Sequence, residues 1–244
     1  MKKLFYVFIL LMIFPSSQAQ VKDYGIRLGG TLSSIGGTVF NDNEDWGSFS
    51  QITSSNTSTV GKKTPLVSLM PTFFLRYNIT NKIFVQPEIG ISFNGFNQKN
   101  ENISRLSTSN SDIKIRFTYL QVPLLVGYEI GESNIRPYVL AGFTPAFLVS
   151  NKVSAELITT IKINGEQQKE VSESSGGADK RFDLGFTLGG GLLGFPTIPR
   201  LGAEIRYTLG IINLVDADTS GLYSYAFTAY NNTLSVALHY RFNQ

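Results

Sequence analysis

His239 is the residue best suited to chemistry, because it is the only histidine in the chain. A hydrolase built on it would need a serine nucleophile within hydrogen-bond reach and an acidic or amide group to orient the imidazole. Ser235 shares a face of the expected last strand with His239, but it lies roughly 13 Å away along that strand, too far for a direct hydrogen bond. We therefore expect a structural histidine inside the fold. A membrane-embedded lipid hydrolase that uses His239 is the less favoured alternative.

Two short motifs resemble ligand-binding loops but lack the necessary context. Residues 189–194 match Gly-x-Gly-x-x-Gly, which binds a dinucleotide only where it opens a helix; Phe195 and Pro196 follow instead, so these glycines are expected to let a strand pack closely. Residues 216–221 copy the first half of a calcium loop, but its twelfth position is Phe227 rather than a bidentate glutamate. A further acidic cluster also lacks ligand spacing: Asp42, Glu44 and Asp45. No catalytic, cofactor-binding or metal site is predicted, and the absence of cysteine excludes thiol chemistry.

The elements that must position these residues are eight strand-like segments joined alternately by long and short connections. The segments are residues 24–32, 66–79, 83–96, 113–130, 135–149, 182–194, 201–213 and 227–242. The short connections are residues 80–82, 131–134 and 195–200, and the long ones are residues 33–65, 97–112, 150–181 and 214–226. Tight turns at one end and long polar loops at the other are typical of an all-β fold, an eight-stranded antiparallel up-and-down transmembrane β-barrel.

Strict alternation assigns most segments an apolar and a polar face. In the last segment Leu234, Val236 and Leu238 alternate with Ser235 and His239, and residues 66–79, 83–96 and 201–213 show the same period. Residues 113–130 and 135–149 are apolar on both faces, so their orientation stays open. Aromatic residues near the short turns predict a lipid-interface girdle: Tyr24, Tyr77, Tyr128, Tyr138, Tyr240 and Phe242.

Charged residues on the polar faces are predicted to fill the lumen: Arg27, Arg76, Glu88, Asp183, Glu204, Arg206 and Arg241. An eight-stranded barrel is just wide enough for side chains to fill, and buried charges need partners. We expect Arg76 to lie beside Glu88, and Glu204 to share a face with Arg206. The charges then form an ionic plug, and a selectivity ring of a pore is disfavoured by the barrel size.

The first residues predict an export signal. Lys2 and Lys3 precede an uninterrupted apolar run over residues 4–14, and small residues at Ser17 and Ala19 favour cleavage before Gln20. The predicted organisation is a signal peptide over residues 1–19 and a barrel domain over residues 20–244. Removing the leader lowers the formal net charge from +3 to +1, so no nucleic-acid partner is expected.

Three stretches resemble a known family. Residues 119–125 (Tyr-Leu-Gln-Val-Pro-Leu-Leu), residues 136–142 (Arg-Pro-Tyr-Val-Leu-Ala-Gly) and residues 239–242 (His-Tyr-Arg-Phe) are similar to the outer-membrane β-barrels widespread in Bacteroidota. Members of this family are often labelled "porin family" or PorT-like. The resemblance covers essentially the whole mature chain and implies a small barrel of the OmpA/OmpX type in the bacterial outer membrane. It implies no defined activity.

The resulting expectation is a non-enzymatic outer-membrane barrel whose long loops serve surface interaction or membrane integrity. A subunit of an outer-membrane secretion or transport assembly is the main alternative. Expected partners are outer-membrane lipid, the barrel-assembly machinery through the strand that ends at Phe242, and an envelope protein bound by the loops. Residues 48–59 are poor in apolar side chains and are expected to be mobile. Residues 155–166 alternate around Asn164 and Gly165 and predict a β-hairpin above the membrane, whose exposed edge could recruit a partner strand.

Overall fold

The computed structural model describes residues 21–36, 58–103, 107–131, 135–161, 167–174, 180–195, 197–214 and 229–242. The predicted leader, most of the expected mobile segment, the acidic cluster at Asp42 and the calcium-like motif at residues 216–221 lie outside these ranges. The ranges contain no helix long and apolar enough to cross a membrane.

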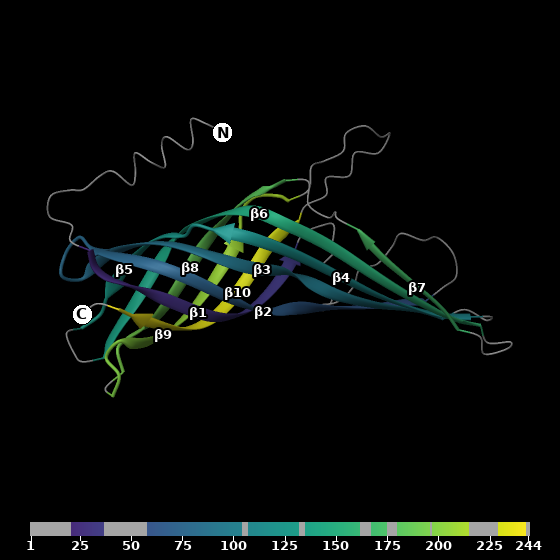
Figure 1. Ribbon diagram of the computed structural model, residues 1–244, viewed down its shortest axis with the longest axis horizontal. Helices are drawn as coiled ribbons and strands as arrows, with labels where there is room; N and C mark the ends of the chain where they lie inside the picture. Colours follow the sequence, from purple (N-terminus) through teal and green to yellow (C-terminus); the bar gives the residue numbers. More distant parts are fainter. Residues whose placement is uncertain are drawn as a thin grey trace.

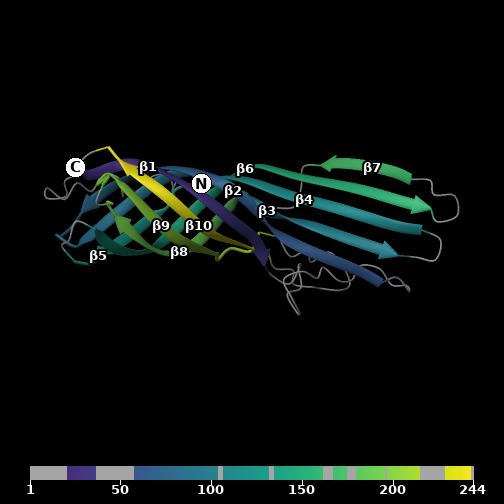
Figure 2. The same cartoon turned by 90° about the horizontal axis from the view of Figure 1, so that it is seen from below.

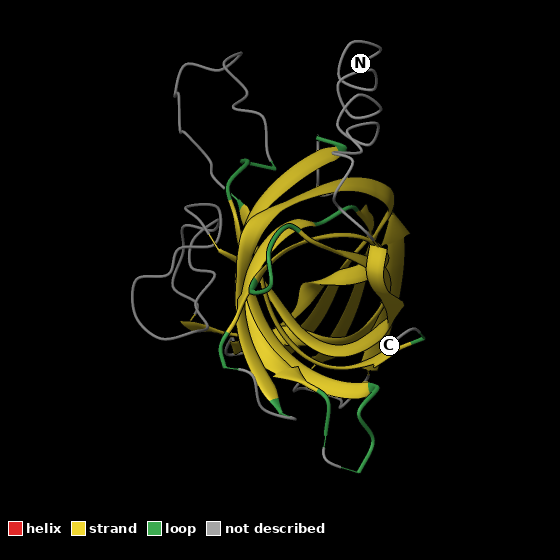
Figure 3. Cartoon of the chain, turned by 90° about the vertical axis from the view of Figure 1, so that its left-hand side faces the viewer, coloured by secondary structure: helices red, strands yellow, loops and turns green. Residues whose placement is uncertain are grey.

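The predicted antiparallel ring of eight strands is confirmed (Figures 1 and 3). The strands are β1 (Val21–Gly36), β2 (Ser58–Asn78), β3 (Ile83–Ile103), β4 (Ser107–Gln121), β5 (Leu124–Glu129), β6 (Arg136–Ile161), β7 (Gln167–Ser174), β8 (Phe182–Leu193), β9 (Leu201–Gly210) and β10 (Tyr230–Arg241). The ring closes because β1 pairs with β10, from Gly25 opposite Arg241 to Gly36 opposite Tyr230. β4 and β5 share one place in the ring, and β7 lies off it.

The fourth predicted segment is interrupted once, between β4 and β5. Pro123 has no N–H to donate to a ladder. β4 therefore ends at Gln121, and β5 begins at Leu124. Both neighbouring strands nevertheless stay bound, because the Val122 N–H donates to the Pro145 carbonyl (2.9 Å) and the Pro123 carbonyl accepts from the Glu88 N–H (2.9 Å). The interruption therefore leaves the wall closed.

Four ring strands, β2, β3, β4 and β6, run beyond the barrel and form a projecting sheet, where the sequence predicted polar loops (Figure 2). β3 and β4 pair as far as Ile103 opposite Thr108, so most of residues 97–112 is strand rather than loop. β2, β6 and β7 complete this five-stranded sheet. The predicted hairpin is confirmed by the pairing of β6 with β7 from Val153–Ser174 to Thr160–Gln167; its turn at residues 162–166 lies outside the described residues.

Apolar side chains face outward around the ring, as the alternation predicts. Val67, Leu69, Ile205 and Val236 are each more than half exposed, which gives the wall a continuous apolar exterior. The two segments that were apolar on both faces are now oriented: in β5 Leu125 points inward and Val126 outward, and in β6 Leu140 points inward and Val139 outward.

The predicted aromatic girdle is correct except for one member. Tyr24, Tyr128, Tyr240 and Phe242 are each at least one-third exposed on the outer face, and Tyr77 is partly exposed. Tyr138 was assigned to this girdle wrongly, because it is buried inside the barrel. The register of β6 turns Pro137 and Val139 outward and therefore turns Tyr138 inward.

Two apolar clusters fill the lumen at different heights. One contains Phe96, Phe117 and Tyr119 and lies toward the projecting sheet. The other contains Phe84, Leu125, Tyr138, Leu140 and Leu193 and lies toward the short turns. The charged residues occupy the space between and around these clusters.

Candidate functional site in the barrel lumen

All seven charged residues predicted for the lumen do point into it and are at most 5% exposed. They come from six strands, in which every second side chain points inward. The residues are Arg27, Arg76, Glu88, Asp183, Glu204, Arg206 and Arg241.

Four of these residues form a quartet that crosses the lumen, hereafter the ionic quartet: Arg27, Glu88, Glu204 and Arg206. Arg206 donates to both carboxylate oxygens of Glu88, at 2.8 and 2.7 Å, and its Nη2 donates to Glu204 Oε2 at 3.0 Å. Arg27 lies 3.4 Å from Glu88 and 3.6 Å from Glu204. The predicted contact of Glu204 with Arg206 is confirmed, and two cations balance two anions.

Arg76 is not the partner of Glu88 that the sequence predicted. Its guanidinium instead donates twice to Gln86 Oε1, at 2.9 and 2.6 Å, and lies 3.9 Å from Glu129. Gln86 in turn donates to Glu88 at 2.6 Å. The reason is register: Phe74, not Arg76, stands opposite Glu88 on β2, so an amide bridges the two charges.

This polar chain continues toward the short-turn end of the barrel. Glu129 accepts from Arg136 Nη1 at 3.1 Å, and Arg136 is the first residue of β6. Sequence reasoning missed Gln86, Glu129 and Arg136 as site residues. Gln86 was already on the polar face of its segment, whereas Glu129 was hidden in a segment that is apolar on both faces.

Tyr138 joins the apolar cluster near the short turns to the ionic quartet. Its hydroxyl donates to Glu204 Oε2 at 2.6 Å, and its ring packs edge-on against Phe84. Gly191 on β8 makes room for it, because a Cβ there would come within 2.7 Å of the Tyr138 hydroxyl. Gly189, Gly190 and Gly191 therefore serve close packing, as predicted, and they continue a strand rather than opening a helix, whereas Gly194 follows the strand with a φ of 80°.

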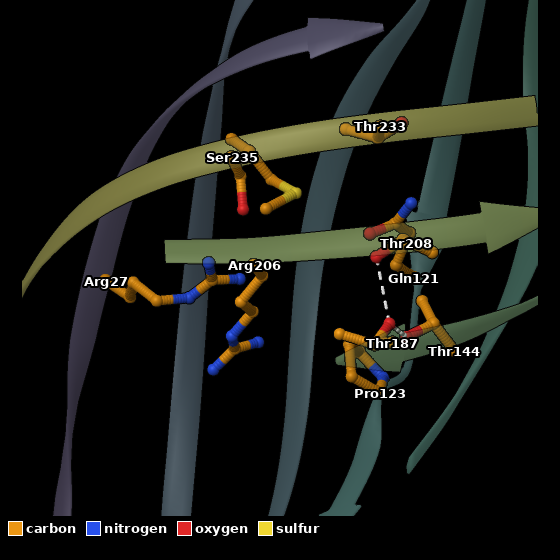
Figure 4. A pocket seen from close by; sticks show the side chains of 10 residues that line it. Arg27, Gln121, Pro123, Thr144, Thr187, Arg206, Thr208, Thr233 and Ser235 are labelled. Carbon is orange, nitrogen blue, oxygen red and sulfur yellow. Dashed lines mark hydrogen bonds between the residues drawn. The ribbon is translucent and has the colours of Figure 1, made fainter. Parts of the chain in front are cut away.

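A small polar cavity lies beside the quartet (Figure 4). It measures about 20 Å³ as the space open to the centre of a water molecule, which is enough for about one water. Arg27 and Arg206 line one side, together with Ser235, and the hydroxyl groups of Thr144, Thr187 and Thr208 lie on the other. These three hydroxyls form a chain, from Thr144 to Thr187 at 2.7 Å and on to Thr208 at 2.9 Å.

His239 is buried beside this network without a nucleophile. Its ring stacks edge-on against Phe74 and Tyr138, and its Nε2 has no hydrogen-bond partner. Gly202 faces it, and a Cβ at that position would collide with the imidazole. Ser235 shares its face, as predicted, but no hydrogen bond joins the two side chains. Within the described ranges, no group of three or more His, Asp or Glu side chains could hold a metal ion.

Comparison with known proteins agrees with this architecture. The family model described as "Outer membrane protein beta-barrel domain" matches residues 18–216. No curated protein matches the chain.

Solved outer-membrane barrels match along most of the chain at low identity. The attachment invasion locus protein Ail of Yersinia pestis is 15% identical, with 91% of this chain and 100% of that chain covered and a TM-score of 0.39. Neisserial surface protein A is 11% identical, with coverages of 90% and 97% and a TM-score of 0.36. The N-terminal barrel domain of Pseudomonas aeruginosa OprF is 11% identical, with coverages of 91% and 100% and a TM-score of 0.28. Similarity at this level does not bear on function.

Proposed function

The chain belongs to the family of outer membrane protein beta-barrel domains, and we propose that it is a non-enzymatic, charge-plugged member of that family. It is an outer-membrane β-barrel protein located in the bacterial outer membrane. The proposal adds that the lumen conducts neither ions nor solutes and that the parts outside the barrel carry the surface function.

The observation that carries the closed lumen is the ionic quartet. Glu88 on β3 and Arg206 on β9 bind each other directly through the interior, and all four side chains are at most 4% exposed. Breaking such a buried pair leaves an uncompensated charge, at a cost of about 3–5 kcal/mol. Apolar clusters above and below the quartet add two further obstructions for a hydrated ion.

Single-channel recording tests this proposal. Purified full-length protein in planar bilayers should give no large, stable, porin-like currents. Glu88→Ala/Arg206→Ala should conduct slightly more than the wild type, because the quartet is opened, but it should not reach porin-like currents, because both apolar clusters remain in that variant. Large and stable wild-type currents would refute the closed lumen.

The finer family assignment also forms part of the proposal. Four of the motif residues shared with the Bacteroidota barrels labelled "porin family" or PorT-like contribute to the lumen here, because they are turned inward or bind inward groups: Tyr119, Arg136, Tyr138 and His239. This common use supports a PorT-like barrel. We further propose cleavage before Gln20, short turns in the periplasm and the projecting sheet outside the cell.

A second candidate function is a subunit of a secretion or transport assembly, favoured by the projecting sheet. In the described residues, β7 is paired on one side only, with β6, and a strand edge with free N–H and C=O groups can accept a partner strand. Co-purification from detergent should then recover a stable envelope protein with the wild type but not after deletion of residues 157–170. If neither the wild type nor the deletion variant co-purified with another protein, this candidate function would be refuted.

The absence of an enzyme activity is proposed from the surroundings of His239. Aromatic rings flank its imidazole, and a hydrolase would need a serine hydroxyl there instead. Any lipid hydrolysis by the purified protein should be unaffected by His239→Ala. Loss of a measurable hydrolase activity in that variant would restore the enzyme alternative.

A further inference from the structure

A group of three cations on the outer wall faces away from every lumen residue discussed so far: Lys114 and Arg116 on β4 and Lys152 on β6. Arg116 stands directly opposite Lys152, and Lys114 stands opposite Ser154 on the next outward row. Their neighbours Ile115 and Phe117 pack inward with the apolar cluster, so alternation turns the cations outward. Lys114 and Lys152 are exposed.

These cations begin where the apolar exterior ends. Phe93 on β3 and Phe147 and Val149 on β6 are 41%, 49% and 70% exposed. Thr118 pairs with Phe93 on one side and with Ser150 on the other, and Arg116 and Lys152 occupy the next outward row. The three cations therefore lie at the junction of the apolar wall and the projecting sheet, at the height expected for lipid headgroups.

The protein itself supplies little opposite charge at this position. Arg116 donates only to neutral acceptors, namely Asn97 Oδ1 at 2.7 Å and the carbonyls of Ile115 and Phe96. Among the described residues, neither Arg116 nor Lys152 has a carboxylate within ion-pair distance, and Lys114 has one, Asp112 at 3.6 Å. Like charges directly opposite each other on neighbouring strands are destabilising, so an external anion would relieve this arrangement.

We propose that Lys114, Arg116 and Lys152 bind a phosphate group carried by a glycolipid of the surrounding outer leaflet. Continuity with the apolar wall favours a lipid-borne phosphate over a free one, because the acyl chains of such a lipid would lie against Phe147 and Val149. Acidic side chains lie on the outer side of the group on the same face: Asp112 beside Lys114 at 3.6 Å, and opposite it Glu156, which pairs with Lys169 at 2.8 Å. The three cations therefore lie on the membrane side of these anions, and Arg116 and Lys152 have no carboxylate within ion-pair distance among the described residues.

The site is tested by measuring how much lipid the full-length protein retains in detergent. The result then does not depend on the membrane orientation proposed above. Native mass spectrometry should show that the wild type retains lipid A with its phosphates. Lys114→Gln/Lys152→Gln should weaken this binding roughly tenfold to thirtyfold, since each basic residue near a membrane surface contributes about 1 kcal/mol. The effect should decrease at high salt. Heat-modifiable migration verifies that the variant is folded.

Three controls decide the outcome. Lys82→Gln, at a short turn on the opposite end, and Lys169→Gln, farther out on the same face, should both leave lipid A retention unchanged. Dephosphorylated lipid A should be poorly retained by the wild type. The proposal would be overturned if the wild type retained lipid A and dephosphorylated lipid A equally, or if either control variant lost as much lipid A as Lys114→Gln/Lys152→Gln. It would also be overturned if millimolar inorganic phosphate alone displaced the lipid.

Discussion

Glu88 and Arg206 lie 118 residues apart in the chain and bind each other through two hydrogen bonds inside the barrel. The pair connects β3 to β9, which are not neighbours in the ring. It therefore braces the barrel across its interior, independently of the backbone ladder.

Removing Glu88 should destabilise the barrel by about 3–5 kcal/mol, because Arg27 and Arg206 would then share Glu204 alone. Glu88→Ala/Arg206→Ala should recover part of this loss. Glu88→Ala/Arg76→Ala should recover none, because Arg76 binds Gln86 and not Glu88. Urea unfolding in lipid vesicles measures all three variants. Equal recovery in both double variants would contradict the pairing of Glu88 with Arg206 rather than Arg76.

Tyr138→Phe should lower the free energy of unfolding by about 1–3 kcal/mol, because Glu204 loses a buried hydrogen-bond donor. Tyr128→Phe is the matched control, since Tyr128 lies on the outer face of the neighbouring strand and should change stability by less than about 0.5 kcal/mol. The same vesicle unfolding assay compares them. A larger loss of stability for Tyr128→Phe than for Tyr138→Phe would contradict the inward position of Tyr138 and favour its assignment to the outer girdle.

Deleting residues 241–244 should prevent insertion. Phe242 donates its N–H to the Tyr24 carbonyl at 2.8 Å, and its ring packs against Tyr24 and Tyr240, so the deletion weakens the seam between β10 and β1. An open sheet edge is not tolerated in lipid, and the truncated protein should accumulate as periplasmic aggregate. Deleting residues 243–244 alone should have no effect. Normal heat-modifiable migration of the longer truncation would argue against this role for Phe242.

Protease added to intact cells should cut the connections between β1 and β2 or between β6 and β8, and it should spare residues 131–134. The expectation follows from the alternation of long and short connections along the chain and from the projecting sheet, which lies at the end of the barrel opposite the short turn between β2 and β3 (Figure 1). Mass spectrometry of the released peptides identifies the sites. Cleavage restricted to residues 131–134 would instead indicate the opposite orientation, with the short turns outside the cell.

Glu156 should titrate below the ordinary glutamate range. A hydrogen bond from Lys169, together with its charge, lowers the pKa of the Glu156 carboxyl. With a lowered pKa, the stabilisation by this exposed pair is present above the unfolded-state value and is lost as the pH falls through the folded-state value. Carboxyl carbon shifts in NMR give the midpoint. Lys169→Gln should raise it, and an unchanged midpoint would remove Lys169 as the cause.

Alternation predicted which side chains face inward, but not which of them meet. Inward placement depends only on the local period of two, so seven charges could be assigned to the lumen from the sequence, whereas the buried Glu129, in a segment apolar on both faces, could not. Pairing depends on register between strands that are far apart in the chain, and the Arg76–Glu88 expectation failed because Phe74 occupies the position opposite Glu88. Where both faces of a segment are apolar, as around Tyr138, the sequence does not show which side chains point inward, and only the pairing register with neighbouring strands decides this.

The lengths of the strands were underestimated for a different reason. Residues 97–103 and 107–112 are rich in Asn and Ser, and polar composition alone favours a loop. Pairing with β2 and β6 keeps these residues extended, so tertiary context overrides their low intrinsic preference. The cation group at Lys114 depends on this extension and could not be recognised without it.

The projecting sheet also gives the molecule a mechanical property. Four of its five strands continue into the barrel wall, since β2, β3, β4 and β6 each belong to both parts. Inter-strand hydrogen bonds in an antiparallel ladder run perpendicular to the strands, so a pull on the outer tip loads many of them simultaneously in shear. A tether attached there would transmit tension directly to the embedded ring, and the sheet would resist peeling apart one bond at a time.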